Sequence, residues 1–253
     1  KTKNKSHTTP LRFIISVFFV LLLISGCALF TGTEHTVFPT SKLPPPGKFS
    51  GYYDVSGRIF FKHPDGKHNG ELLMQISSSS EMKLRIFAPI VGSLIYELRA
   101  GPEKFLVLNY QDKNFVLEEN SWEVRQTWLG MDLSLDELRW LIIGRLPEKT
   151  QSWKRKKLPT GEWQLTQNTT EIRIRYNSDD YIESMNKSRE GLLEYKAEIP
   201  QYQKEKESFF PKKVQIEDYT GNNLWMIYIK ELHAVSGSMK TLEFDPPTDL
   251  KPL

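Results

Sequence analysis

The chain has 253 residues, with 34 lysines and arginines against 31 aspartates and glutamates. Its first 26 residues hold four of the basic residues and no acidic one, so the rest of the chain is close to neutral. That balance lacks the clustered positive charge of a nucleic-acid-binding protein, and we expect no nucleic-acid partner.

The N-terminal segment has the pattern of an export signal. Basic residues up to Arg12 precede residues 13–24, which are apolar except for Ser16. This run is shorter than the roughly 20 residues of a membrane helix and is typical of a signal peptide. Small residues then precede Cys27, the only cysteine, and this resembles the cleavage site of bacterial lipoproteins. We therefore predict a cleaved signal peptide over residues 1–26 and lipid on Cys27; the alternative is an ordinary signal peptide with a chance cysteine.

Lipidation of Cys27 would leave no free thiol for a disulfide, a metal site or a nucleophile. A stable anchor needs two or more acyl chains, and known lipoproteins carry three on this cysteine. Ala28, where an aspartate would signal retention, indicates delivery to the outer membrane, with the protein facing the periplasm. Residues 27–52 are rich in proline and glycine and are predicted to be a flexible tether.

Alternating apolar and polar residues predict six strands in the first half of the domain. Turn residues such as 64–66 and 101–102 separate them, and their close spacing is typical of an antiparallel meander. The expected strands are residues 55–62, 71–77, 82–87, 94–100, 105–110 and 114–118.

Two helices are expected to interrupt the strands. Residues 120–129 have an amphipathic period and end at Gly130. Ser134 and Glu137 form a capping-box sequence, and apolar residues keep helical spacing over residues 135–142.

Strands resume after residues 149–158, a polar and basic segment predicted to be a surface connection. They cover residues 162–167, 171–176, 181–187, 192–199, 212–217 and 224–232. About eleven strands and a helical pair indicate an α+β fold, in which one antiparallel sheet curves around the helices to cover their apolar faces. We assign residues 53–244 to this single domain and expect the Pro-rich tail, residues 245–253, to run loose.

No catalytic or metal-binding constellation is evident. The chain has no G-x-S-x-G, P-loop or H-E-x-x-H motif. His63 and His68 flank a polar turn, where histidines are more often solvated than bound to a metal. The basic run Lys154–Lys157 is expected to be a solvated loop, or else to touch anionic head groups or an acidic partner.

The connection between the third and fourth strands, residues 88–93, is unexpectedly apolar. Connections are normally polar, but this one presents Ile90 and Val91 between Pro89 and Gly92. Either the loop folds under and both side chains join the core, or it projects and dips into a membrane or a partner. Burial of each side chain would contribute roughly 1.5–3 kcal/mol, enough for a transient contact and too little for an anchor.

Three features in this order resemble the LolB family, outer-membrane lipoproteins that receive other lipoproteins from the periplasmic carrier LolA. In that family the first strand begins G-R-I, the exposed loop reads N-P-L-G, and the helical pair reads G-M…L-x-x-L-R-x-x-I-x-G-L-P. The matching residues here are Gly57-Arg58-Ile59, the apolar loop, Leu129-Gly130-Met131, Leu135, Leu138-Arg139, Ile142, Gly144 and Leu146-Pro147.

The similarity covers residues 53–147, with two departures from the family pattern. The loop has Ile90 and Val91 in place of a single leucine, and Arg145 is inserted after Gly144. The C-terminal half is longer than in the family, and no residues are matched there.

The resemblance implies a half-open β-barrel with the helices in or over its mouth, around an apolar cavity that takes the acyl chains of an incoming lipoprotein. The loop of Pro89, Ile90, Val91 and Gly92 would help to deliver these chains to outer-membrane lipids. The partners would be lipoprotein clients and a LolA-like carrier; a monomer with no cofactor, metal or catalytic residue is expected. The candidate cavity residues, each equally explained as ordinary core, are Phe60, Leu73, Leu84, Ile86, Leu98, Leu106, Trp128, Leu138, Trp140 and Leu141.

Two other functions remain open from the sequence. A structural or assembly lipoprotein with the same curved sheet would bind a protein partner in its concave face. An envelope hydrolase would need histidine, aspartate and serine side chains that converge in a pocket, which the sequence does not predict.

Overall fold

The computed structural model describes residues 51–253 except for residues 65, 79, 147–152 and 206–207. The predicted signal peptide, Cys27 and nearly all of the predicted tether lie outside the described residues. No helix among the described residues is long and apolar enough to cross a membrane. In chain order, the elements are β1 (Gly51–His63), β2 (Gly66–Ser77), β3 (Met82–Phe87), β4 (Leu94–Ala100), β5 (Lys104–Asn109), β6 (Asn114–Glu119), α2 (Trp122–Leu129), α3 (Leu135–Ile143), β7 (Lys154–Lys157), β8 (Trp163–Gln167), β9 (Thr170–Tyr176), β10 (Ile182–Arg189), β11 (Leu192–Glu205), β12 (Ser208–Asp218), β13 (Leu224–Ser236) and β14 (Lys251–Pro252).

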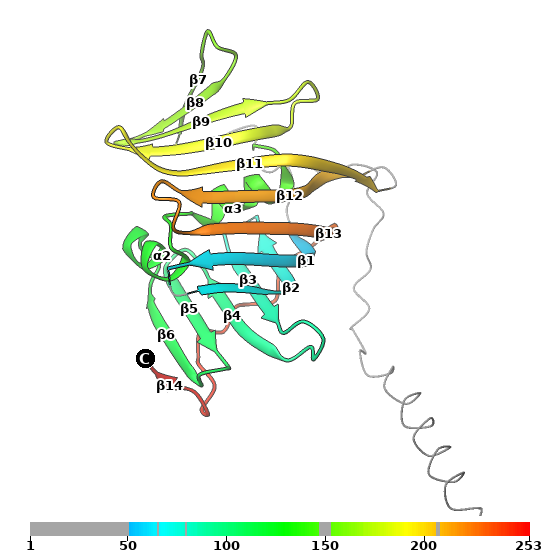
Figure 1. The fold of residues 1–253 in the computed structure, drawn as a ribbon, viewed down its shortest axis with the longest axis vertical. Helices are drawn as coiled ribbons and strands as arrows, with labels where there is room; N and C mark the ends of the chain where they lie inside the picture. The colour runs from blue at the N-terminus through cyan, green and yellow to red at the C-terminus, as the bar shows by residue number, and fades with distance from the viewer. Residues whose placement is uncertain (1–50, 65, 79, 147–152, 206–207) are drawn as a thin grey trace, which may run out of the picture. The chain divides into compact units, whose positions relative to one another are not determined.

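All these strands form one sheet, in the order β14-β6-β5-β4-β3-β2-β1-β13-β12-β11-β10-β9-β8-β7 (Figure 1). β1 joins the two halves of the sheet, because it pairs with β2 on one side and with β13 on the other. The pairs are antiparallel except for β14 and β6. β14 and β7 are the two ends of the order, so the sheet is unclosed. The predicted single, mostly antiparallel sheet is confirmed, but the class is mainly β, with fourteen strands where about eleven were expected.

β7 lies in the segment that was expected to be a plain surface connection. Its four residues are all basic and all exposed, so it lacks the apolar alternation by which a strand is recognised. β7 pairs with β8 at one edge of the sheet. Lysines are common on edge strands, because their charge discourages pairing with another chain.

The expectation of a loose C-terminal tail is wrong. Lys251 and Pro252 pair in parallel with Asn114 and Phe115 of β6. The physical reason is an apolar surface outside the main core. Leu106 and Leu108 of β5 lie on the face opposite that core, and Leu250 packs against them and buries them.

The main hydrophobic core lies on one face of the sheet, which we call the inner face. Along β1, Tyr53, Val55 and Ile59 alternate into this core, as side chains of a strand must. α3 buries eight of its nine residues there, whereas α2 buries only Leu129. Every described residue of this core falls between Tyr53 and Ala234, so residues 28–253 contain all of them.

Local sequence explains where the two helices begin and end. The Ser134 hydroxyl accepts from the Glu137 amide at 3.2 Å, and the Glu137 carboxylate accepts from the Ser134 amide at 2.8 Å. These two reciprocal hydrogen bonds confirm the predicted capping box. Gly130 and Gly144 end α2 and α3 with φ values of 76° and 73°, in the left-handed region that glycine tolerates.

Position 57 must be a glycine because β1 and β13 approach each other closely there. The register of β1 against β13 shifts between Ser56 and Gly57, and a Cβ at Gly57 would lie 2.0 Å from the Tyr228 carbonyl oxygen.

We expect Gly57→Ala to force the strands apart and to lower the free energy of unfolding by about 1–3 kcal/mol, as overpacking does. Chemical denaturation measures this loss. Gly101→Ala is the control, because its nearest new contact would be the Phe244 ring at 3.4 Å; equal losses in both variants would contradict the explanation.

Candidate functional site

Seven of the ten candidate cavity residues meet on the inner face. They come from β3, β4 and the helical pair, and six of them are buried in the main core with the seventh packed against it. The six are Leu84, Ile86, Leu98, Leu138, Trp140 and Leu141, and the seventh is Trp128.

The other three candidates lie apart from these seven. Leu106 is buried on the opposite, outer face of the sheet. Phe60 follows the inward-facing Ile59, so strand alternation turns it outward. Leu73 is 37% exposed and lines a hollow on the outer face. Alternation counted from a confirmed core residue would have separated these three from the rest.

The helical pair covers the inner face, and α3 does so with tightly packed side chains. Leu141, Ile142 and Ile143 of α3 have no exposed surface. These three side chains therefore leave no space for a ligand beside them. α2 is the less buried part of that cover, since seven of its eight side chains remain partly or fully exposed.

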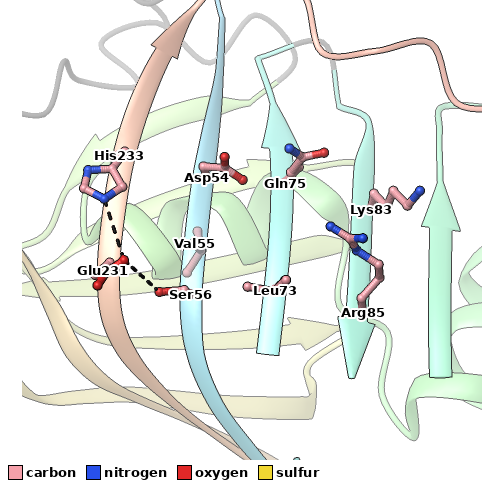
Figure 2. A pocket seen from close by; sticks show the side chains of 9 residues that line it. All are labelled: Asp54, Val55, Ser56, Leu73, Gln75, Lys83, Arg85, Glu231 and His233. Carbon is pink, nitrogen blue, oxygen red and sulfur yellow. Dashed lines mark hydrogen bonds and ion pairs between the residues drawn. The ribbon is translucent and has the colours of Figure 1, made fainter. Parts of the chain in front are cut away.

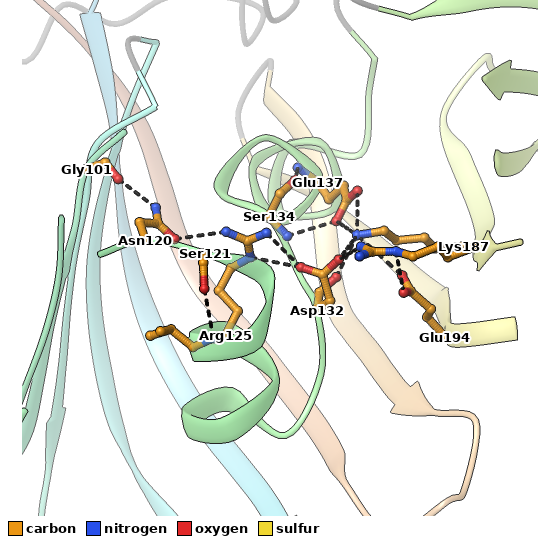
Figure 3. Close-up of polar contacts among 11 residues, drawn as sticks. Gly101, Asn120, Ser121, Arg125, Asp132, Ser134, Glu137, Lys187 and Glu194 are labelled. Atoms are coloured by element: carbon orange, nitrogen blue, oxygen red, sulfur yellow. Dashed lines mark hydrogen bonds and ion pairs between the residues drawn. The ribbon is translucent and has the colours of Figure 1, made fainter. Parts of the chain in front are cut away.

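A group of buried charges fixes the segment between α2 and α3 to β10 (Figure 3). Lys187 of β10 is 3% exposed, and its Nζ lies 2.8 Å from Asp132 Oδ2 and 3.2 Å from Glu137 Oε1. Arg125 of α2 reaches the other oxygen of Asp132, with Nη2 and Oδ1 2.7 Å apart. Arg189 also pairs with Asp132. Buried charges are tolerated when they are paired in this way. Asp132 thereby connects α2 to β10, and Glu137 connects α3 to β10.

The neighbouring cations control the ionisation of Asp132. Burial alone would raise the pKa of its carboxyl, but the charge and hydrogen bond of Lys187, helped by Arg125, outweigh burial and lower the pKa. A carboxyl with a lowered pKa stabilises the fold above its unfolded pKa of about 4, and this contribution is lost as the pH falls through the folded value. Glu194, at the edge of the group, differs: burial is the largest influence and raises its pKa.

This charged group was not predicted from the sequence, apart from Glu137 as a capping residue. One signal was available. Met185 of β10 is completely buried, and alternation places Lys187 on the same face. A lysine at an inward position requires a buried anion.

We expect Lys187→Met to leave Glu137 buried without a cation and Asp132 with only Arg125 and Arg189, and to lower the free energy of unfolding by about 3–5 kcal/mol at pH 7. The loss should shrink between pH 7 and pH 4, because Asp132, whose pKa Lys187 lowers, would take up a proton more readily in the variant. Denaturation at several pH values measures both effects.

The control for this prediction is Lys196→Met. Lys196 lies 3.1 Å from Glu198 in an ion pair of which both partners are about half exposed, so its removal should cost less than about 1 kcal/mol. A loss in Lys187→Met that is equally small, or that does not change with pH, would contradict the assigned role.

Residues 88–93 form a tight, projecting turn between β3 and β4. The Gly92 amide donates to the Ala88 carbonyl at 3.0 Å and closes the turn. Ile90 is fully exposed, Val91 is 80% exposed, and Ile90 has a φ of 79°. A β-branched residue rarely adopts that conformation. The alternative in which the two side chains join the core is therefore wrong, and membrane contact stays a prediction.

A shallow hollow of about 230 Å³ crosses β13, β1, β2 and β3 on the outer face (Figure 2). It brings together Ser56, Glu231, His233 and Asp54, the residue types of a hydrolase. Their order is wrong for catalysis, because a triad needs the histidine between the serine and the acid. Here Ser56 Oγ donates to Glu231 at 3.4 Å, and His233 Nε2 is 4.0 Å from the same carboxylate.

His68 and the basic run each contact an aromatic ring. The His68 ring stacks on Phe61, with the ring centroids 4.8 Å apart. Across the described ranges, no three histidine, cysteine, aspartate or glutamate side chains are grouped to hold a metal ion. In the basic run, Arg155 lies over the Trp163 ring at 4.2 Å from its centroid.

Comparison with known families identifies the chain. The model of the family described as "Outer membrane lipoprotein LolB" matches residues 52–230. The chain belongs to the LolB family. LolB proteins are non-catalytic outer-membrane lipoproteins, and membership implies a role in the localisation of outer-membrane lipoproteins.

Solved structures with this fold are distant in sequence. A LolA-superfamily protein from Nitrosomonas europaea is 10% identical, with a TM-score of 0.51 over 78% of this chain and 91% of that chain. A DUF1329-family protein from Desulfovibrio piger is 8% identical, with a TM-score of 0.51 over 73% and 86% of the two chains. At these identities the likeness shows the fold alone. A search of curated proteins finds no match.

Proposed function

We propose that this LolB-family protein accepts lipoproteins from a LolA-like periplasmic carrier on its inner face and inserts them into the outer membrane. Lipid on Cys27 would hold it there, and the tether of residues 27–52 would let the domain reach both carrier and membrane. The observation that carries the proposal is the projecting turn, residues 88–93, which holds Ile90 and Val91 in solvent.

The physics of acyl transfer requires direct contact between apolar sites. Burial of a 16-carbon acyl chain is worth on the order of 12 kcal/mol, at about 0.8 kcal/mol per methylene. Release into water is therefore very slow, whereas passage from one apolar site to another involves little net change in free energy. Such a step needs neither a nucleophile nor a metal, which agrees with membership of a non-catalytic family.

The inner face would receive the acyl chains after α2 moves. The seven candidate residues that meet there present a continuous apolar surface, from β3 and β4 to α3. α2 contributes little burial, so its displacement would cost less than that of α3. The pairs that Arg125 and Lys187 form with Asp132 would limit the movement and restore the closed position.

The loop would make the contact with the membrane. A φ of 79° at Ile90 costs of order 1–3 kcal/mol, so the fold keeps two apolar side chains in water at a conformational cost. Their burial in a bilayer would recover roughly 1.5–3 kcal/mol each. That balance favours a brief and reversible contact, as a protein that delivers its cargo repeatedly requires.

A second candidate function is favoured by one observation. Because side chains such as Leu141 and Ile142 are completely buried on the inner face, the domain could instead be an assembly lipoprotein that binds a protein partner on the sheet. Mass spectrometry of lipids and lipopeptides that co-purify with residues 28–253 separates the two functions. Acyl-bearing molecules support the acceptor, and their absence together with a bound protein supports the alternative.

We expect Ile90→Glu combined with Val91→Glu to leave uptake from a loaded carrier unchanged and to reduce insertion into vesicles at least tenfold. Two buried carboxylates at the tip would oppose entry into the bilayer, because charged groups are costly there. A transfer assay with a labelled lipoprotein measures both steps separately.

The control replaces two other exposed apolar residues, Leu192→Glu with Tyr219→Glu; their side chains are 75% and 72% exposed. This variant adds the same charge away from the loop and should insert the lipoprotein normally. Normal insertion by the loop variant would refute the loop's role, and an equal defect in both variants would show that added negative charge alone is responsible.

A further inference from the structure

The apolar loop and the turn between β1 and β2 lie at the same end of the sheet. The β2–β3 ladder ends at the pair of Glu71 and Phe87, so residues 88–93 begin beside the adjoining part of β2. Beyond that point β1 and β2 stay paired as far as His63 and Gly66. The β1–β2 hairpin therefore stands next to the loop that carries Ile90.

Two lysines face each other across this hairpin. Lys62 is directly opposite Lys67, and like charges in that position destabilise a sheet. Lys67 is exposed and forms no ion pair or hydrogen bond with any described residue, and Lys62 Nζ reaches the Gly221 carbonyl at 3.3 Å. The next pair along the ladder is Phe61 and His68, whose stacked rings hold the hairpin in place.

Two of the described carboxylates at this end have other partners. Glu71 Oε1 lies 2.8 Å from Arg58 Nε. Asp112, in the β5–β6 turn, accepts from Asn109 Nδ2 at 2.7 Å. Asp65, which follows Pro64 in the turn, lies outside the described residues. The described part of the hairpin thus keeps two ammonium groups together without a paired anion.

We propose that Lys62 and Lys67 bind the phosphates of anionic phospholipids while Ile90 and Val91 are inserted in the bilayer. The inference rests on the proposed contact between the loop and the membrane, and it names the second part of that contact. Apolar side chains reach below the head groups, and cations on the adjoining hairpin remain at their level, as in other surface-bound amphipathic elements. The phosphates then supply negative charge beside the two lysines.

The test is the binding of residues 28–253, which retain the whole core, to two kinds of vesicle. One kind contains phosphatidylethanolamine and phosphatidylcholine, and the other also contains phosphatidylglycerol. A lysine near an anionic surface contributes roughly fivefold to binding. We therefore expect Lys62→Gln with Lys67→Gln to weaken binding to the anionic vesicles about 10–25-fold and to leave binding to the zwitterionic vesicles unchanged.

The control removes the same charge from the far edge of the sheet, by Lys154→Gln with Lys156→Gln; both side chains are exposed on β7. It should weaken anionic binding less than about threefold, because charges beyond roughly 10 Å are screened. An equal or larger loss in this control overturns the proposal, since binding would then follow net charge or the β7 edge. Unchanged binding of the Lys62 and Lys67 variant also overturns it.

Two further readouts separate this inference from the proposed function and from misfolding. Ile90→Glu with Val91→Glu should weaken binding to both kinds of vesicle; if it does not, the loop contact fails even where the lysines matter. The melting temperature of the Lys62 and Lys67 variant should be unchanged or higher, because a like-charge pair has been removed. A lowered melting temperature would assign the pair a structural role and overturn the proposal.

Discussion

The packing of α2 and α3 against the inner face of the sheet is the interaction on which the rest of the structure depends. A closed barrel covers its own interior, but this sheet is unclosed, and its apolar face has to be covered by something else. The two helices do this unequally. α3 is almost wholly buried, whereas α2 buries a single residue. The inequality leaves α2 as the less buried part of the cover. In the proposed function, this is the part that would move to admit an acyl chain.

The connection between helices and sheet is made with charges where apolar contacts would be more stable. Replacement of a buried ion pair by apolar side chains is often neutral or stabilising. The group around Asp132 and Lys187 is therefore better explained by its positioning of the helices than by a gain in the free energy of unfolding. The hydrogen bonds within this group are directional, so they fix the position of the helices on the sheet. In the proposed function, they would also re-form after α2 has moved. The exposed Ile90 and the paired Lys62 and Lys67 are further departures from the most stable arrangement, and such departures gather at functional sites.

Much of the fold could be predicted because its signals are local. Ser134 and Glu137 cap α3 through contacts three residues apart, and the strands of the first half follow from alternation and turn residues. The failures concern information that is not local. β7 consists only of basic residues, so its strand character comes from pairing with β8. Leu250 covers Leu106 across the sheet edge, and the partners of Lys187 lie 50 and 55 residues away in the chain. The face on which each candidate cavity residue lies was predictable from alternation, and the tight packing of α3 on the inner face was not.

The central claim is that acyl chains pass over the inner face, beneath the helical cover. Its most direct test is transfer of a lipoprotein that carries a photoreactive acyl chain, followed by mass-spectrometric identification of the cross-linked residues. We expect cross-links to Leu84, Leu138 and Trp128, which share the inner face. Cross-links confined to outer-face residues such as Leu73 and Phe60, or none at all during productive transfer, would contradict it.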